Sequence, residues 1–186
     1  LPDSNSNDLD IAVQAAESIF PDWKRTNIRD RAEIMFRFKT LLESNIDELA
    51  HLISLDNGKT IEDAKASINR GKEVVEFATS LPNILKGDSS QVADGITCTM
   101  THEPLGVVAG ITPFNFPAMI PMWMFGVAIA TGCTFVLKPS EKDPGVPLRL
   151  AELMMEAGAP PGVLNVVNGD KAAVDALIKH DDVKAV

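Results

Sequence analysis

The stretch from Gly106 to Glu141 constrains the fold more than any other part of the sequence. It contains, in order, an apolar β-branched run (107–111), a loop with two prolines (112–117), an apolar helical segment to about Thr131, a second apolar run (134–137) and a charged turn (138–141). Short apolar runs of this kind are typical of strands buried in a parallel sheet. The order predicts a βαβ unit whose two loops leave the sheet at its carboxyl edge. Open α/β sheets bind their ligands at that edge.

Beyond Glu141 the alternation of helix and strand continues. The pattern predicts helices over 147–157 and 172–179, a strand over 163–167, and a further strand beginning at Val183. Strands that alternate with helices indicate a parallel, doubly wound sheet. No GxGxxG motif occurs, so the standard dinucleotide-binding fingerprint is absent.

Residues 1–85 have a helical pattern throughout. The spacing of apolar residues predicts helices over 8–20, 27–42, 46–55 and 60–79. Pro21 is expected to end the first helix and Asn57-Gly58 the third, while Thr60 and Asp63 resemble a capping box at the start of the fourth. Helices that precede the first strand of a sheet are expected to pack as one layer against one face.

The period of the sequence changes between Ser89 and His102. Threonines alternate with Cys98, Met100 and His102, which predicts an exposed strand with polar side chains on one side. Two interpretations remain open: a strand that leaves the domain to pair with another subunit, or an edge strand within the monomer.

Composition excludes several classes of function. The chain has 186 residues, 45% of them hydrophobic and 23% charged, as expected for one globular domain. The net charge of −9 and the absence of Lys/Arg clusters argue against binding to nucleic acid or to an anionic membrane. Prolines and glycines interrupt the longest apolar stretch (114–137), which predicts a buried helix rather than a membrane span.

The cysteines and histidines suggest no further chemistry. Two cysteines, Cys98 and Cys133, provide no disulfide framework, which suits a reducing compartment. Neither has a nearby base in the sequence, so packing is the expected role of both. The three histidines are scattered, so no metal site is expected.

Asn115 is the best catalytic candidate. It lies between two phenylalanines in the proline-bounded loop, at the predicted ligand-binding edge. Its amide can donate a hydrogen bond to a developing oxyanion without any requirement for protonation. The alternative is that it only satisfies backbone groups of the loop.

Charged residues at the end of the second strand could bind a ligand. Lys138 and Glu141 lie three residues apart at the end of the second strand, where they could hold the hydroxyls of a ribose, or could form only a solvated turn. Glu141 would repel a 2′-phosphate and so favour NAD over NADP, although Lys142 could offset that charge. Arg70, on the fourth predicted helix, would by pattern alone be only solvated, as most helix arginines are.

These motifs resemble those of the aldehyde dehydrogenase superfamily. The PFNFP loop, the apolar helix containing Met and Trp, and the KPSE turn are most similar to those of the coenzyme A-acylating methylmalonate/malonate-semialdehyde dehydrogenases. The resemblance covers nearly the whole chain. It implies an α/β fold: a variant Rossmann-like parallel sheet with flanking helices, an N-terminal helical layer and a protruding oligomerisation strand.

The resemblance also implies a division of the chain and a role for each candidate residue. Residues 1–186 would be part of an NAD-binding domain, with a helical layer over 1–85, a β excursion for oligomerisation over 86–103 and a βαβ core over 104–186. The nucleophilic cysteine and general-base glutamate would lie outside this chain. Asn115 would be catalytic and Arg70 would hold the substrate carboxylate. Cofactor contacts would come from Thr112, Phe114, Lys138, Glu141 and Lys142.

The expected reaction is NAD-dependent oxidation of a carboxylated semialdehyde to an acyl-CoA with decarboxylation, with coenzyme A as co-substrate. Two alternatives to this reaction remain. The chain could belong to another subgroup that hydrolyses its acyl-enzyme with water, or it could be an inactive fragment that binds NAD or a partner subunit. The full-length enzyme would be a homodimer or homotetramer. It would be cytoplasmic in a bacterium or in the mitochondrial matrix of a eukaryote, and not secreted, since no signal or transit segment is visible at Leu1.

Overall fold

The computed structural model describes residues 4–186, which form a mixed α/β structure. In chain order the elements are α1 (Ser6–Arg25), α2 (Ile28–Ser44), α3 (Ile46–Asn57), α4 (Ile61–Thr79), α5 (Leu81–Ile84), β1 (Asp88–Ala93), β2 (Ile96–Met100), β3 (Val107–Ile111), α6 (Met119–Thr131), β4 (Thr134–Lys138), α7 (Gly145–Glu156), β5 (Leu164–Val166), α8 (Lys171–Lys179) and β6 (Val183–Ala185).

A parallel sheet with the strand order β5-β4-β3-β6 confirms the predicted fold class. The two central strands, β3 and β4, are almost wholly buried, as their unbroken apolar runs predicted. From β3 the chain adds β4 and β5 on one side, and then returns to add β6 on the other. The order therefore reverses between β3 and β6, which is the kind of switch point where α/β sheets form a crevice at their carboxyl ends.

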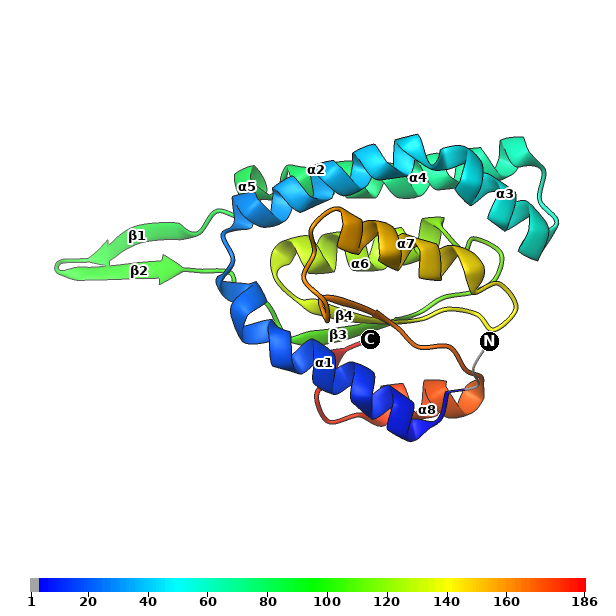
Figure 1. Cartoon of the computed structure of the whole chain (residues 1–186). Helices are drawn as coiled ribbons and strands as arrows, with labels where there is room; N and C mark the ends of the chain where they lie inside the picture. The colour runs from blue at the N-terminus through cyan, green and yellow to red at the C-terminus, as the bar shows by residue number, and fades with distance from the viewer. Residues whose placement is uncertain (1–3) are drawn as a thin grey trace.

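Helices cover both faces of this sheet (Figure 1). α6 and α7 lie on one face, and α2 to α5 form a further layer outside them; α1 and α8 lie on the opposite face. The expected single N-terminal layer is thus divided, because α1 packs against β3, β4, β5 and α8 rather than beside α2. The apolar residues of α1, Leu9, Val13 and Ala16, share a small core with Val107 and Val136 of the sheet.

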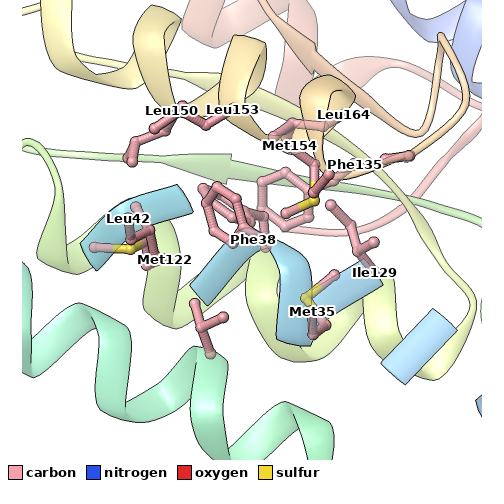
Figure 2. Close-up of a cluster of buried hydrophobic side chains, with 14 of the residues drawn as sticks. Met35, Phe38, Leu42, Met122, Ile129, Phe135, Leu150, Leu153, Met154 and Leu164 are labelled. Carbon is pink, nitrogen blue, oxygen red and sulfur yellow. The ribbon is translucent and has the colours of Figure 1, made fainter. Parts of the chain in front are cut away.

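The larger core lies between the sheet and the outer helices (Figure 2). Its centre is a row of rings: Phe38 and Phe125 have centroids 5.9 Å apart, and Phe125 and Phe135 are 6.4 Å apart. α6 is apolar on most of its surface because α4 covers the side that faces away from the sheet. The sheet approaches α6 closely at Gly110, where an added Cβ would lie 2.7 Å from Phe135 Cζ and 2.9 Å from Met124 Sδ.

Most helix boundaries match the capping residues in the sequence. α3 ends at Gly58 and α6 at Gly132, both in the left-handed conformation, and the Thr60 side chain accepts a hydrogen bond from the backbone of Asp63 at the start of α4. The prediction for Pro21 was wrong, because α1 continues through it to Arg25. The extra turn carries Trp23 into the core, where its indole N–H donates to the Ile129 carbonyl at 3.1 Å.

An antiparallel hairpin, β1–β2, projects from the body of the molecule (Figure 1). All of its strand residues are exposed. The sequence pattern indicated an exposed strand near 97–102 but not its partner β1, which the turn at Asp94-Gly95 joins to it. None of the helices described is long and apolar enough to cross a membrane.

Candidate functional site

The ends of β3 and β4 place the two predicted loops beside each other at the carboxyl edge of the sheet. Ile111 pairs with Lys138 in the strand register, and the backbone N–H of Thr112 donates to the Lys138 carbonyl at 3.1 Å. The Thr112 side chain is buried, and its hydroxyl oxygen has no hydrogen-bond partner among residues 4–186. Both loops therefore start from the paired ends of two neighbouring strands.

Lys138, at the end of β4, forms an ion pair with Glu141 of the loop that follows, and the lysine is buried while the glutamate is exposed. The Lys138 side chain is 4% exposed and that of Glu141 is 55% exposed, and the ammonium lies 3.3 Å from Glu141 Oε2. A hydrogen bond from its own backbone N–H, and then the Lys138 ammonium, lower the pKa of the Glu141 carboxyl. Glu141 thus presents an ionised hydrogen-bond acceptor to solvent, and the buried Lys138 ammonium beside it supplies donors. A neighbouring acceptor and donor suit a vicinal diol such as a ribose.

The loop after β3 presents Phe114 and Asn115 to solvent on the same edge. Lys142 joins the two loops, since its ammonium lies 4.8 Å from the centroid of the Phe114 ring. Asn115 therefore lies neither in the interior nor on the opposite edge from Glu141. The structure brings Thr112, Phe114, Asn115 and the Lys138–Glu141 pair together as the βαβ pattern predicted.

The corner between α3 and α4 (residues 57–60) donates hydrogen bonds to the Asn115 loop. Asn57, the last residue of α3, donates from Nδ2 to the Phe114 carbonyl at 2.7 Å. The ammonium of Lys59 donates to the Asn115 carbonyl and lies 3.8 Å from the centroid of the Phe116 ring. The sequence predicts only a helix end at Asn57-Gly58, and no local signal in it points from Asn57 or Lys59 to a loop 56 residues away.

A buried carboxyl, Asp143, lies beside this corner. Its side chain is 2% exposed, and neither carboxyl oxygen has a hydrogen-bond partner among residues 4–186. Burial raises the pKa of Asp143 to about 6, and repulsion from Asp56 adds to the shift, while the Asn57 amide and the Lys59 ammonium oppose it. Asp143 was also missed, because a charged turn in a sequence gives no indication that one of its carboxyls is buried.

Comparison with known proteins assigns the chain to a family. The model of the aldehyde dehydrogenase family matches residues 1–186. The chain belongs to this family. Malonate-semialdehyde dehydrogenase 1 of Geobacillus kaustophilus is 53% identical over 187 aligned positions, which cover 100% of this chain and 38% of that protein. The chain thus spans less than half the length of such a relative.

Two solved structures of aldehyde dehydrogenases are similar over almost the whole chain. A methylmalonate-semialdehyde dehydrogenase from Oceanimonas doudoroffii superposes with a TM-score of 0.99 at 51% identity, covering 100% of this chain and 38% of that one. A protein from Sinorhizobium meliloti, described as a methylmalonate-semialdehyde dehydrogenase and solved with NAD, gives 0.97 at 51% identity, with 98% and 37% covered. The family that the sequence motifs suggested is confirmed.

Arg70 lies apart from the two loops of this aldehyde dehydrogenase chain. It is exposed on α4, and its backbone carbonyl accepts a hydrogen bond from the Trp123 indole of α6 at 3.3 Å. The neighbouring Gly71 lets α4 approach α6 closely, since a Cβ there would lie 2.3 Å from the Met122 methyl. The backbone of Arg70 is therefore held beside the helix that follows the Asn115 loop, and no hydrogen bond or ion pair among residues 4–186 joins its guanidinium to Asn115 or Glu141.

The cysteines of this chain lie away from the two loops. Cys98 is exposed on the hairpin and Cys133 is buried just before β4, and both are free thiols. Within residues 4–186 no group of three or more Asp, Glu, His or Cys side chains is arranged to hold a metal ion.

Proposed function

We propose that this chain is the NAD-binding portion of an aldehyde dehydrogenase that oxidises a carboxylated semialdehyde of the malonate or methylmalonate type to an acyl-CoA, with decarboxylation. The names of relatives that are about half identical support this substrate class. The single observation that carries the proposal is that an exposed carboxamide, Asn115, and the Lys138–Glu141 ion pair share one edge of the sheet.

The residues at that edge fit an adenosine-containing cofactor. Glu141 would accept hydrogen bonds from the ribose hydroxyls and Lys138 would donate to them, while the exposed ring of Phe114, the backbone at Thr112 and the Lys142 ammonium would complete the contacts. When bound, NAD would supply the hydride acceptor. The ionised Glu141 carboxylate would repel a 2′-phosphate and so select NAD over NADP.

Asn115 would act on the reacting carbonyl. In the proposed reaction a cysteine outside this chain attacks the aldehyde, and the Asn115 amide donates to the oxyanion that forms on the carbonyl oxygen. Oxidation to the thioester removes the aldehyde hydrogen as hydride. The thiol of coenzyme A then displaces the enzyme cysteine, which leaves as a thiol. The carboxylate leaves the acyl group as carbon dioxide, and the carbon that carried it takes up a proton from water. Loss of one such donor costs about 2.7–4 kcal/mol of transition-state stabilisation.

Arg70 would hold the carboxylate of the substrate through a bidentate pair. It is exposed on α4, which packs against α6, the helix that follows the Asn115 loop, so the substrate carboxylate would lie on the α4 side of that loop. In the full-length enzyme we expect Arg70→Ala to lower kcat/KM for a carboxylated aldehyde, and to leave that for an uncharged aldehyde of equal length nearly unchanged. Equal losses for the two aldehydes would favour a dehydrogenase that acts on uncharged aldehydes.

Three segments of the chain would have different roles. Residues 104–186 would form the cofactor-binding core, residues 1–85 would cover it, and the excursion at 86–103 would pair with another subunit. Because the nucleophilic cysteine would lie outside this chain, residues 1–186 alone should form no NADH when mixed with NAD and aldehyde.

The experiment that tests the cofactor site is a titration of the full-length protein with NAD and with NADP. Glu141→Gln should weaken NAD binding and narrow the preference for NAD over NADP, because a neutral amide no longer repels the 2′-phosphate. Glu152→Gln, on the exposed side of α7, is the matched control. A Glu141→Gln variant with unchanged affinity for both cofactors would remove the ribose assignment.

A further inference from the structure

We propose that Asn57 and Lys59 are positioning residues that fix the orientation of Asn115, an inference that rests on the proposed oxyanion role of that carboxamide. Their contacts with the loop are to the backbone carbonyls of Phe114 and Asn115 and to the Phe116 ring, not to the Asn115 carboxamide. Both reach the Asn115 loop from the corner between α3 and α4.

The two hydrogen bonds act on adjacent peptide groups. The Phe114 carbonyl, which accepts from Asn57, belongs to the peptide plane before the Asn115 Cα. The Asn115 carbonyl, which accepts from Lys59, belongs to the plane after it. Peptide groups are planar, so fixing both planes fixes the two soft dihedral angles of Asn115 and with them the direction of its Cα–Cβ bond. The carboxamide, which is otherwise exposed on a loop, thereby has a fixed point of attachment, and only its χ1 and χ2 angles remain to be set.

A third contact strengthens this arrangement. The Lys59 ammonium lies 3.8 Å from the centroid of the Phe116 ring, within the range of a cation–π interaction. Its bond to the Asn115 carbonyl is charge-assisted, which makes it stronger than a bond between neutral groups. Lys59 therefore holds both the backbone of Asn115 and the side chain that follows it.

Gly58 allows the two donors to point at one loop. It ends α3 with φ of +79°, a conformation that costs other residues energy, and an added Cβ would meet nothing within 4 Å. The reversal of the chain at this residue places Asn57 and Lys59 on the same side of the corner. Geometry of this kind matters for catalysis, because a misplacement of about 1 Å in a catalytic group can cost on the order of 100-fold in rate.

The first test compares lysine variants of the full-length enzyme. The rate of NADH formation in the first turnover reports on Asn115, and the dissociation constant of NAD reports on the neighbouring β4 loop. Lys59→Met should slow the first turnover at least about tenfold and leave the NAD dissociation constant within about twofold. Lys59→Arg keeps the charge and the donors, so it should recover most of the rate. Lys65→Met, which removes an ammonium from α4 paired with Asp47, should behave as wild type.

The second test is a double-mutant cycle with Asn115→Ala. That variant alone should lose about 10²–10³ in rate, and Lys59→Met should then add less than about twofold, because the group it positions is gone. Asn57→Ala, which releases the other peptide plane, should give the same pattern and serves if Lys59→Met does not fold.

The outcomes separate the two proposals. A wild-type rate in both Lys59→Met and Asn57→Ala, or losses of equal size with and without Asn115, would overturn the positioning role. A wild-type rate in Asn115→Ala alone would instead refute the proposed function of the carboxamide.

Discussion

At the scale of single residues, the candidate site depends on where charge is buried. Lys138 is the last residue of β4 and Asp143 lies in the segment that follows, and both are almost fully buried. Among residues 4–186, Lys138 has a charged partner within 4 Å, Glu141, and Asp143 has none. Asp143 is left without a hydrogen-bond partner among the residues described. A carboxyl in that position is more stable when protonated.

Asp143 should therefore make stability depend on pH. Its carboxyl has a pKa of about 6 in the folded chain, against an ordinary value of 3.8. Between these values the folded state binds more protons than the unfolded state, so the free energy of unfolding falls as pH rises through this window. Above it the ionised group costs on the order of 3 kcal/mol.

The corresponding variant is Asp143→Asn. It should raise the thermal midpoint at pH 7.5 by an amount equivalent to about 1–3 kcal/mol and change it little near pH 4, where the carboxyl is protonated anyway. Melting curves between pH 4 and 8 measure this, with the exposed Asp181→Asn as control. A midpoint shift that is the same at all pH values would show that Asp143 is not the titrating group.

Sequence reasoning found the residues that follow the strands, but not those that support them. Asn115 and Glu141 were identifiable because strand ends in a βαβ unit converge on one edge. Lys59 and Asp143 were not, because their roles depend on contacts between segments far apart in the chain. The position of a side chain does not by itself establish its role. The catalytic role of Asn115 and the binding roles of Arg70 and the Lys138–Glu141 pair therefore stay predictions.

At the scale of secondary-structure elements, one buried arginine joins three helices. Arg31 of α2 donates from Nε to the Ala130 carbonyl of α6 at 3.0 Å, and its Nη1 donates to the carbonyl of Thr26 at the end of α1. The carboxyl ends of α1 and α6 thus share one cation, which suits the partial negative charge at helix C-termini. Burial lowers the pKa of the guanidinium.

Removal of this cation should destabilise the junction. Arg31→Met leaves the carbonyls unpaired in the interior, and we expect a loss of about 2–4 kcal/mol in the free energy of unfolding. Arg31→Lys should recover only part of it, because an ammonium cannot reproduce the fork of donors. Denaturant titration measures the loss, with the exposed Arg29→Met on the same helix as control. Equal stability of the two variants would contradict the assignment.

The elements that sequence predicted best are those with strong local signals. Thr60, Gly58 and Gly132 marked helix ends that the structure has in the same places. The proline rule failed at Pro21 because burial of Trp23 outweighs the local cost of a proline within the helix. β1 was missed because its residues, Asp88–Ala93, are exposed and, apart from Val92, polar or small, so they carry no apolar alternation.

At the scale of the whole molecule, the hairpin is the part least connected to the rest. β1 and β2 pair with each other, and their side chains, including Val92, Ile96 and Met100, are exposed. Both edges of a two-stranded ribbon leave backbone groups open for pairing, which suits the proposed role in oligomerisation.

Replacement of residues 88–100 by a short Gly/Ser linker should therefore change assembly more than fold. In the full-length protein we expect the far-UV circular dichroism to keep its helical shape, and light scattering to report a smaller particle. A milder variant, with serine at Val92, Ile96 and Met100, should shift the same equilibrium in the same direction. An unchanged mass in both variants would assign subunit pairing to another surface.

The close packing at Gly110 of β3 connects the loop at the sheet edge to the side chains of Phe135 and Met124. A methyl group there would wedge the first helix of the βαβ unit away from the strands, since Phe135 and Met124 already occupy the space. That helix begins three residues after Phe116, so an outward push would drag the Asn115 loop with it. Substitution of the buried Gly110 should accordingly inactivate the full-length enzyme, because the absence of a side chain at this position lets α6 and the Asn115 loop keep their places.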